Sequence, residues 1–345
     1  VQAIKEAADL SAVEAIYNNG SFVTGNETVD KVEDIVIEGK ATVLPEAVNG
    51  VVTLTQDVEL AEKVVVNAGE TVTVNLNGND ITAASRAFNV NGGELVLTGE
   101  GKISLTEKGK QAIWLLGTGG KVSVGEGVTI ESQNAEGSSG AYALAVWSSV
   151  EDAEIDLAGK LLGGNGITVN GDVTGNVTLN IASTAVIDVA DTGLYLAGPA
   201  TTNIAEASIT GGKTGIEIRA GVLNVHGATI RGNGTFVSPI PGNPNGSTTV
   251  GAGIAVAQHT TNKNITVTVD QDTKIYAQKQ ITMARPQGGT DGVLSVSVTN
   301  CPNIVVGSCV KFTDDTFVVN GSEVTKTVVS APDGDNDGGD GGAGE

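Results

Sequence analysis

The 345-residue chain has 40 acidic and 19 basic residues, a net charge of −21, and a hydrophobic content of 40%. That content can form a buried core, so the composition excludes a disordered chain. The negative charge disfavours nucleic acid and anionic membranes as partners, because both are polyanions. No run is long and apolar enough to insert in a membrane, and we expect a soluble protein exposed on a surface, without a cofactor.

The first twenty residues predict helical structure. Apolar residues such as Ile4, Ala8 and Ile16 lie near one stripe of a helix, and Ser11 and Glu14 match a capping box. We treat residues 1–50 as an N-terminal segment. It is expected to cap the open end of the following domain or, alternatively, to anchor the chain to other virion or cell-surface proteins.

Residues 51–327 contain a phrase that recurs eight times with changing sequence. A small residue usually opens it, an alternating apolar run follows, and a Gly- or Asn-rich corner leads to a second run. The phrases open at Ala87, Ala112, Ala143, Gly166, Gly193, Gly215, Gly253 and Gln280, and successive openings are 25, 31, 23, 27, 22, 38 and 27 residues apart. Such repeats predict a solenoid, because one unit cannot bury its own apolar face.

The runs alternate with period two, which predicts short strands with one face inward. No helical pattern lies between them, and glycine supplies the sharp corners. The fold class is therefore all-β, a right-handed single-stranded parallel β-helix over residues 51–327. Residues 328–345 form an acidic Gly/Asp-rich tail whose composition predicts disorder.

The segments VTLTQDVEL, TVTVNLNGNDIT and AFNVNGGELVLTGEGKI resemble the pectate-lyase-like β-helices of bacterial surface proteins and phage structural proteins. The resemblance covers about residues 50 to 325. It implies one of several functions: a polysaccharide lyase or hydrolase, an adhesin, a tailspike, or a virion fibre. Fibres of this kind are often trimers, so the resemblance also raises a homotrimer, although no coiled-coil segment is present.

Enzymes with this fold need carboxylates at equivalent positions on successive coils. The equivalent positions at the phrase openings contain one acid. They are Asn89, Trp114, Ala145, Thr168, Tyr195, Glu217, Ala255 and Thr282. This row argues against a lyase or hydrolase, and we expect a protein without enzymatic activity.

The best catalytic candidates are Glu217, Arg219, His226 and Arg231, which lie within one phrase. Glu217 and Arg219 are two residues apart on one strand, so they share a face. The plainer interpretation is a solvent-exposed ion pair, which contributes little stability. His226 lies at a corner and is expected at the surface, and His259 has no acidic neighbour.

The tail offers a weak metal candidate. Asp333, Asp335 and Asp337 match the first half of an EF-hand loop, but the bidentate acid at its end is out of place. An acidic tail without bound metal is the preferred interpretation. Cys301 and Cys309 fit either a disulfide or two small buried side chains.

Binding candidates are found in an insertion at residues 236–250, which explains the interval of 38 residues. Its candidate residues are Phe236, Pro239, Pro241, Asn243 and Asn245, and a second loop spans residues 132–141. Trp114 and Trp147 are placed to stack on sugar rings or, equally, to pack in the core or at its rim. Asn75, Asn77, Asn79, Asn89 and Asn91 predict stacked Asn ladders at corners, with a glycan-binding face as the alternative.

These observations favour a structural and binding β-helix on a virion surface, as a capsid decoration or fibre. The end sequence Ala-Gly-Glu345 resembles the product of a phage head maturation protease. The alternative is a secreted adhesin on a bacterial cell surface, in which the acidic tail would precede a wall anchor. A glycan is an expected ligand in both settings.

Overall fold

The computed structural model describes residues 41–138, 140–148, 150–237, 249–258, 263–284 and 293–298, and four short strands outside these ranges. The chain divides into two compact units, Val1–Ala41 and Thr42–Glu345. In the first unit, β1 (Phe22–Thr24) and β2 (Glu27–Val29) form an antiparallel pair. The helix predicted over residues 1–20 and the tail after residue 327 lie outside the described residues.

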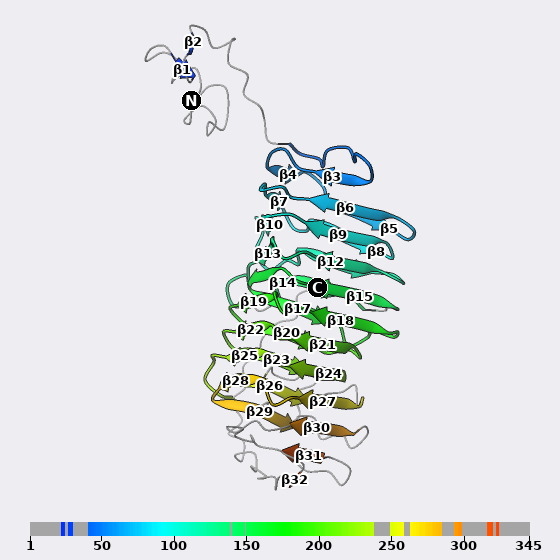
Figure 1. Cartoon of the computed structure of the whole chain (residues 1–345), viewed down its shortest axis with the longest axis vertical. Helices are drawn as coiled ribbons and strands as arrows, with labels where there is room; N and C mark the ends of the chain where they lie inside the picture. The colour runs from blue at the N-terminus through cyan, green and yellow to red at the C-terminus, as the bar shows by residue number, and fades with distance from the viewer. Residues whose placement is uncertain are drawn as a thin grey trace. The chain divides into compact units, whose positions relative to one another are not determined.

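The second unit is a parallel β-solenoid, which confirms the predicted all-β solenoid fold (Figure 1). Nine successive coils each contribute one strand to each of three sheets. The structure contains no helix among the described residues. In that part of the chain, accordingly, no helix has the length and apolarity that crossing a membrane requires.

Sheet 1 holds the first strand of each coil, and Figure 1 shows these strands stacked in chain order. Its strands are β3 (Val51–Thr53), β6 (Thr71–Asn75), β9 (Glu94–Thr98), β12 (Lys121–Val124), β15 (Ala153–Leu157), β18 (Val177–Ile181), β21 (Thr201–Ala205), β24 (Gly221–His226), β27 (Ile265–Val269), β30 (Leu294–Val298), β31 (Thr316–Val319) and β32 (Ser322–Glu323). All pairs are parallel except β31 with β32.

Sheet 2 holds the second strand of each coil. Its strands are β4 (Val58–Leu60), β7 (Ile81–Ala83), β10 (Gly101–Leu105), β13 (Val128–Ser132), β16 (Lys160–Gly163), β19 (Val186–Val189), β22 (Ser208–Gly211), β25 (Thr229–Gly232) and β28 (Lys274–Ala277). One inward position of this sheet is occupied by Ile or Leu on eight successive coils: Ile81, Ile103, Ile130, Leu161, Ile187, Ile209, Ile230 and Ile275. Stacking of these buried side chains builds the core that a single coil lacks.

Sheet 3 holds the third strand of each coil, and the predicted phrases open there. Its strands are β5 (Val64–Asn67), β8 (Phe88–Asn91), β11 (Ile113–Leu116), β14 (Tyr142–Val146), β17 (Asn165–Val169), β20 (Thr192–Leu196), β23 (Thr214–Ile218), β26 (Ala252–Ala257) and β29 (Lys279–Ala284). Each phrase therefore begins in sheet 3 and continues into sheet 1 of the next coil.

Steric contact between successive coils explains why four of the phrases open with glycine. A Cβ at Gly193 would lie 2.5 Å from the carbonyl oxygen of Gly215 on the next coil, and a Cβ at Gly166 would lie 2.2 Å from that of Gly193. Gly215 and Gly253 are equally constrained by the coils that follow them. Glycine at this position lets successive coils approach closely.

The Asn-rich stretch differs from the ladder predicted for it. Register places Thr98 opposite Asn75 and Trp114 opposite Asn89, so amides do not stack there. Asn77 and Asn79 instead donate their side-chain amides to the carbonyl oxygen of Leu54, at 3.0 and 3.2 Å. They satisfy backbone acceptors at a corner, as short amide side chains do in turns. Among the five residues of the predicted ladder, Asn91 pairs with another asparagine, Asn67 on β5.

Candidate binding site

The row predicted from the phrase openings lies on the outer face of sheet 3. Strand register pairs its eight members in order from β8 to β29, without a slip. The neighbours of each member on its own strand point into the core, as Ile216 and Ile218 do on either side of Glu217. The single acid of the row is therefore on the outside of the solenoid, where an enzyme of this fold would need several.

Three side chains form an aromatic cluster at one end of this face. The rings of Trp114, on β11, and Trp147, just after β14, make an edge-to-face contact with centroids 4.6 Å apart. The guanidinium of Arg86 lies over the Trp114 ring, 3.5 Å from its centroid. Trp147 remains 40% exposed, whereas Trp114 is half-buried. We call Arg86, Trp114 and Trp147 the aromatic cluster.

Polar contacts fix the position of Arg86. Its guanidinium donates to the side-chain oxygen of Asn89 at 3.3 Å and to that of Gln111 at 3.5 Å. Burial lowers the pKa of Arg86. The two amides and the indole face thus hold a cation on the outer wall, with no carboxylate partner among the described residues, an arrangement typical of cation–π stacking.

Glu217 and Arg219 form an ion pair, but a buried one. The Nε of Arg219 lies 2.6 Å from Oε1 of Glu217, and their side chains are 7% and 0% exposed. The expectation of a solvent-exposed pair is wrong because the insertion covers it. The backbone N–H of Thr249 donates to Oε2 of Glu217 at 3.1 Å, and the hydroxyl of Thr214 donates to the carbonyl of Thr249.

The described ends of the 236–250 insertion fold back against the solenoid. Val237 and Val250 form an antiparallel bridge, and the N–H of Phe236 donates to the side chain of Gln278 at 2.8 Å. Lys279 lies over the half-buried Phe236 ring. The other candidates of the insertion, Pro239, Pro241, Asn243 and Asn245, lie outside the described residues.

Two tyrosines border the ion pair. The ring centroids of Tyr142 and Tyr195 are 6.4 Å apart, and the Arg219 guanidinium lies 4.7 Å from the Tyr195 centroid. Burial raises the pKa of Tyr195 to about 12 and raises that of Tyr142 further. Burial also raises the pKa of Glu217, against the opposing effect of Arg219. Desolvation is therefore the largest influence on the pKa values of Tyr142, Tyr195 and Glu217.

The four catalytic candidates do not converge. Glu217 and Arg219 lie on or next to β23 in sheet 3, whereas His226 ends β24 in sheet 1 and Arg231 lies on β25 in sheet 2. The exposed His226 pairs with Asp270, and Arg231 lies over the ring of Tyr276 at 4.2 Å. His226 is at the surface, as predicted.

Asp270 accepts the hydrogen bonds that fix the corner beside His226. Its Oδ1 accepts hydrogen bonds from the N–H of Gly227 at 3.0 Å and from the hydroxyl of Thr273 at 2.7 Å. Desolvation acts in the opposite direction, but these hydrogen bonds and the His226 pair hold the pKa of Asp270 below its ordinary value. The pair stabilises a corner of the solenoid.

A second feature, missed in the sequence, is an amide ladder on the outer face of sheet 1. Asn224 donates to Asn203 at 3.0 Å, Asn203 to Asn180 at 3.1 Å, and Asn180 to Asp156 at 2.9 Å. Ser123 is the next member of the row, and Lys121, opposite Glu154 in the neighbouring outward row, places Nζ 3.2 Å from Asp156. The sequence pattern that indicates this ladder is an Asn at the same position in the second alternating run of three phrases, NVTLNIA, TTNIA and VLNVH.

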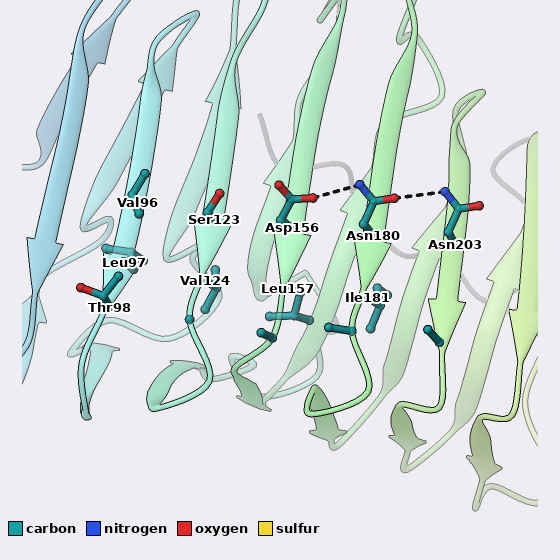
Figure 2. Close-up of a pocket in the computed structure, with 14 residues that line it drawn as sticks. Val96, Leu97, Thr98, Ser123, Val124, Asp156, Leu157, Asn180, Ile181 and Asn203 are labelled. Atoms are coloured by element: carbon teal, nitrogen blue, oxygen red, sulfur yellow. Dashed lines mark hydrogen bonds between the residues drawn. The ribbon is translucent and has the colours of Figure 1, made fainter.

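Figure 2 shows part of this ladder beside an open groove. Asp156, Asn180 and Asn203 project from neighbouring strands at the same level, joined by two hydrogen bonds. The groove has a volume of about 540 Å³ and runs across β9 to β21. Small residues such as Ala182 and Ala205 form part of its wall, so it is shallow and accessible.

Several candidates lie outside the described residues: Asp333, Asp335 and Asp337 of the tail, Cys301, Cys309 and His259. Within the described ranges, no three His, Cys, Asp or Glu side chains come together in a way that would hold a metal ion.

No protein-family model matches the chain, and comparisons with curated proteins and with solved structures give no significant match. The parallel β-solenoid is established by the strand pairing itself. The resemblance to pectate-lyase-like proteins therefore stays a prediction from the sequence.

Proposed function

We propose that the chain is a non-enzymatic β-solenoid of a phage virion, a capsid decoration or fibre, that binds glycans through the aromatic cluster. The observation that most directly supports this proposal is the composition of the outer face of sheet 3. Its one row acid, Glu217, is buried in an ion pair, while Trp147 stays 40% exposed. Trp147 thus gives this face an accessible aromatic ring.

The aromatic cluster suits a sugar. An indole ring presents a flat apolar surface to the C–H groups of a pyranose, and a guanidinium donates to its hydroxyl or carboxylate oxygens. Arg86, Asn89 and Gln111 place donors and acceptors around the Trp114 ring, which contacts the exposed Trp147 ring. The cluster is already assembled by its own contacts, so little side-chain freedom is lost when a ligand binds.

The virion setting rests on the resemblance to phage structural β-helices and on the charge of −21, which suits solubility in a crowded assembly. Other virion proteins would dock on residues 1–50. A homotrimer would fit a fibre. The alternative setting is a bacterial cell surface, where the same cluster would make the chain an adhesin.

Binding is tested by a glycan array followed by calorimetry on the selected glycan. Trp147→Ala should weaken binding at least about tenfold, since truncation of an aromatic residue central to a binding site costs about 2 kcal/mol or more. Tyr276→Ala is the matched control, because Tyr276 is also exposed and also lies beside an arginine, but on sheet 2. Equal loss in both variants would refute the assignment to the cluster.

Absence of catalysis is tested on uronate polymers, with and without Ca²⁺. Release of unsaturated or reducing ends would overturn the proposal and favour a lyase or hydrolase. The setting is tested by immunogold electron microscopy of the native culture. Label on phage particles supports the virion, and label on cell envelopes supports the adhesin.

A further inference from the structure

Five neighbouring strands of sheet 1 each present two outward positions without a charge, and the His226–Asp270 pair lies beside them, at the end of β24. β18 presents Thr178 and Asn180, and β21 presents Thr201 and Asn203. The equivalent outward pairs are Val and Asn on β24, Thr and Thr on β27, and Ser and Ser on β30. We call these ten side chains the uncharged array.

The neighbouring sheet shows that this composition is not general. In the same coils, the outward positions of sheet 2 include Asp188 on β19, Arg231 on β25 and Lys274 on β28. Exposed surfaces of soluble proteins are about one-quarter to one-third charged. Ten neighbouring outward positions without a charge therefore stand out in a chain of net charge −21.

The array is accessible and regular. Thr201, Asn224, Thr266 and Thr268 are exposed, and Asn203 is half-buried in the amide ladder. Parallel strands repeat at about 4.8 Å along a solenoid, so one row offers a hydroxyl or amide at every such interval and the other does so except at Val222 on β24.

We propose that the uncharged array is the docking surface for the same array on a second copy of this chain. A second copy has the same repeat of about 4.8 Å, so its rows match the array strand by strand over the whole face. Identical side chains at this spacing interdigitate between paired sheets, and Asn ladders add to such packing. Two chains of charge −21 repel each other, and two copies can meet at the uncharged array with less repulsion than at the charged outer face of sheet 2.

The size of the array sets the expected strength. Five strands at about 4.8 Å, each about 17 Å long, give roughly 400 Å² per copy and about 800 Å² in total. Specific interfaces that bury less than about 1,200 Å² are weak or transient. We therefore expect dimers at high concentration, and stronger pairing where an assembly holds many copies close together.

The test is sedimentation velocity of the full chain over a range from micromolar to near-millimolar concentration. The wild type should shift from monomer toward dimer as its concentration rises. Thr201→Lys should raise the dimer dissociation constant at least about tenfold, because each copy then carries an unpaired charge into the interface. Thr210→Lys is the matched control, since Thr210 faces outward on β22 in the same coil but in sheet 2.

Circular dichroism establishes that each variant is folded, and Thr266→Lys provides a second charge insertion outside the amide ladder. A wild type that stays monomeric throughout overturns the proposal, as does dimerisation that Thr210→Lys abolishes and Thr201→Lys does not. A monomer in which Thr201→Lys removes glycan binding would assign the array to a glycan instead, and would also overturn it. Because Trp147 lies on another sheet, loss of glycan binding in Trp147→Ala bears on the proposed function alone.

Discussion

Arg219 Nε lies 2.6 Å from Glu217 Oε1, with both side chains buried on what is formally the outside of the solenoid. Removing one member leaves an uncompensated buried charge, which costs about 3–5 kcal/mol in comparable pairs. Arg219→Met should therefore lower the free energy of unfolding by about 3 kcal/mol, measured by urea titration. The double variant Glu217→Met/Arg219→Met should recover most of that loss. If the two single losses simply add, the pair is not coupled.

The pH dependence of Arg219→Met follows from the same pair. Burial raises the pKa of Glu217, and removing the guanidinium removes the main effect that opposes it. The folded state then binds a proton more tightly than the unfolded state, so stability falls as pH rises through the folded pKa. Urea titrations between pH 4 and pH 8 should show this fall relative to wild type, with Glu217→Met/Arg219→Met as the control that lacks it. A parallel pH profile for Arg219→Met and the double variant would contradict the prediction.

Asp270 should give the opposite pH dependence. Its pKa is lowered in the folded state, so its stabilising contribution is present above the unfolded value of about 3.9 and is lost as pH falls toward the folded value. Asp270→Asn should cost about 1 kcal/mol at neutral pH through weaker hydrogen bonds with Gly227 and Thr273. The difference from wild type should shrink in acid, as measured by thermal melts from pH 3 to pH 7. A constant difference over that range would assign the cost to something other than the charge.

Gly193→Ala tests the close approach of successive coils. Its Cβ would lie 2.5 Å from the carbonyl oxygen of Gly215, and backbone on both sides must shift. We expect a loss of about 1–3 kcal/mol, as for other overpacked sites. Gly120→Ala is the control, since its Cβ would find its nearest neighbour at 3.6 Å and its backbone is not left-handed. Similar melting temperatures for the two variants would refute the steric account.

The Ile row of sheet 2 should dominate core stability. Ile209→Ala removes a fully buried side chain that stacks between Ile187 and Ile230, and should cost about 2–5 kcal/mol. Thr210→Ala on the same strand points outward and should stay within about 0.5 kcal/mol of wild type. Urea titration of both variants measures the contrast, and a small loss for Ile209→Ala would mean that neighbouring coils collapse into the space.

Period-two alternation predicted the fold and the outward row correctly. Alternation decides which side of each strand faces the core, and a one-residue slip would bury the polar side chains. The row from Asn89 to Thr282 follows from that constraint alone, which is why strand register reproduces it. The recurring phrase, and not the alternation by itself, predicted the solenoid.

The burial of Glu217 could not be predicted from the sequence, because the residue that covers it, Thr249, lies thirty-two residues later in the chain. Nothing in a Pro- and Asn-rich insertion indicates whether it projects into solvent or folds back onto a neighbouring strand. The contact of Trp114 with Trp147 was missed for a similar reason, since Trp147 lies beyond the end of β14 rather than in the row. The amide ladder could have been predicted from the sequence, because Asn180, Asn203 and Asn224 occupy the same position of their repeats.

Because the coils stack at a constant repeat, the axial distance between equivalent positions on two coils is a whole multiple of that repeat. Trp114 belongs to the third coil and Glu217 to the seventh, so four steps of about 4.8 Å, roughly 19 Å, separate their levels along the axis. Insertion or deletion of one coil between them would change that separation by a single step and leave the local structure of each unchanged. Evolution of such a chain can thus adjust the spacing between two features of its wall without rebuilding either of them.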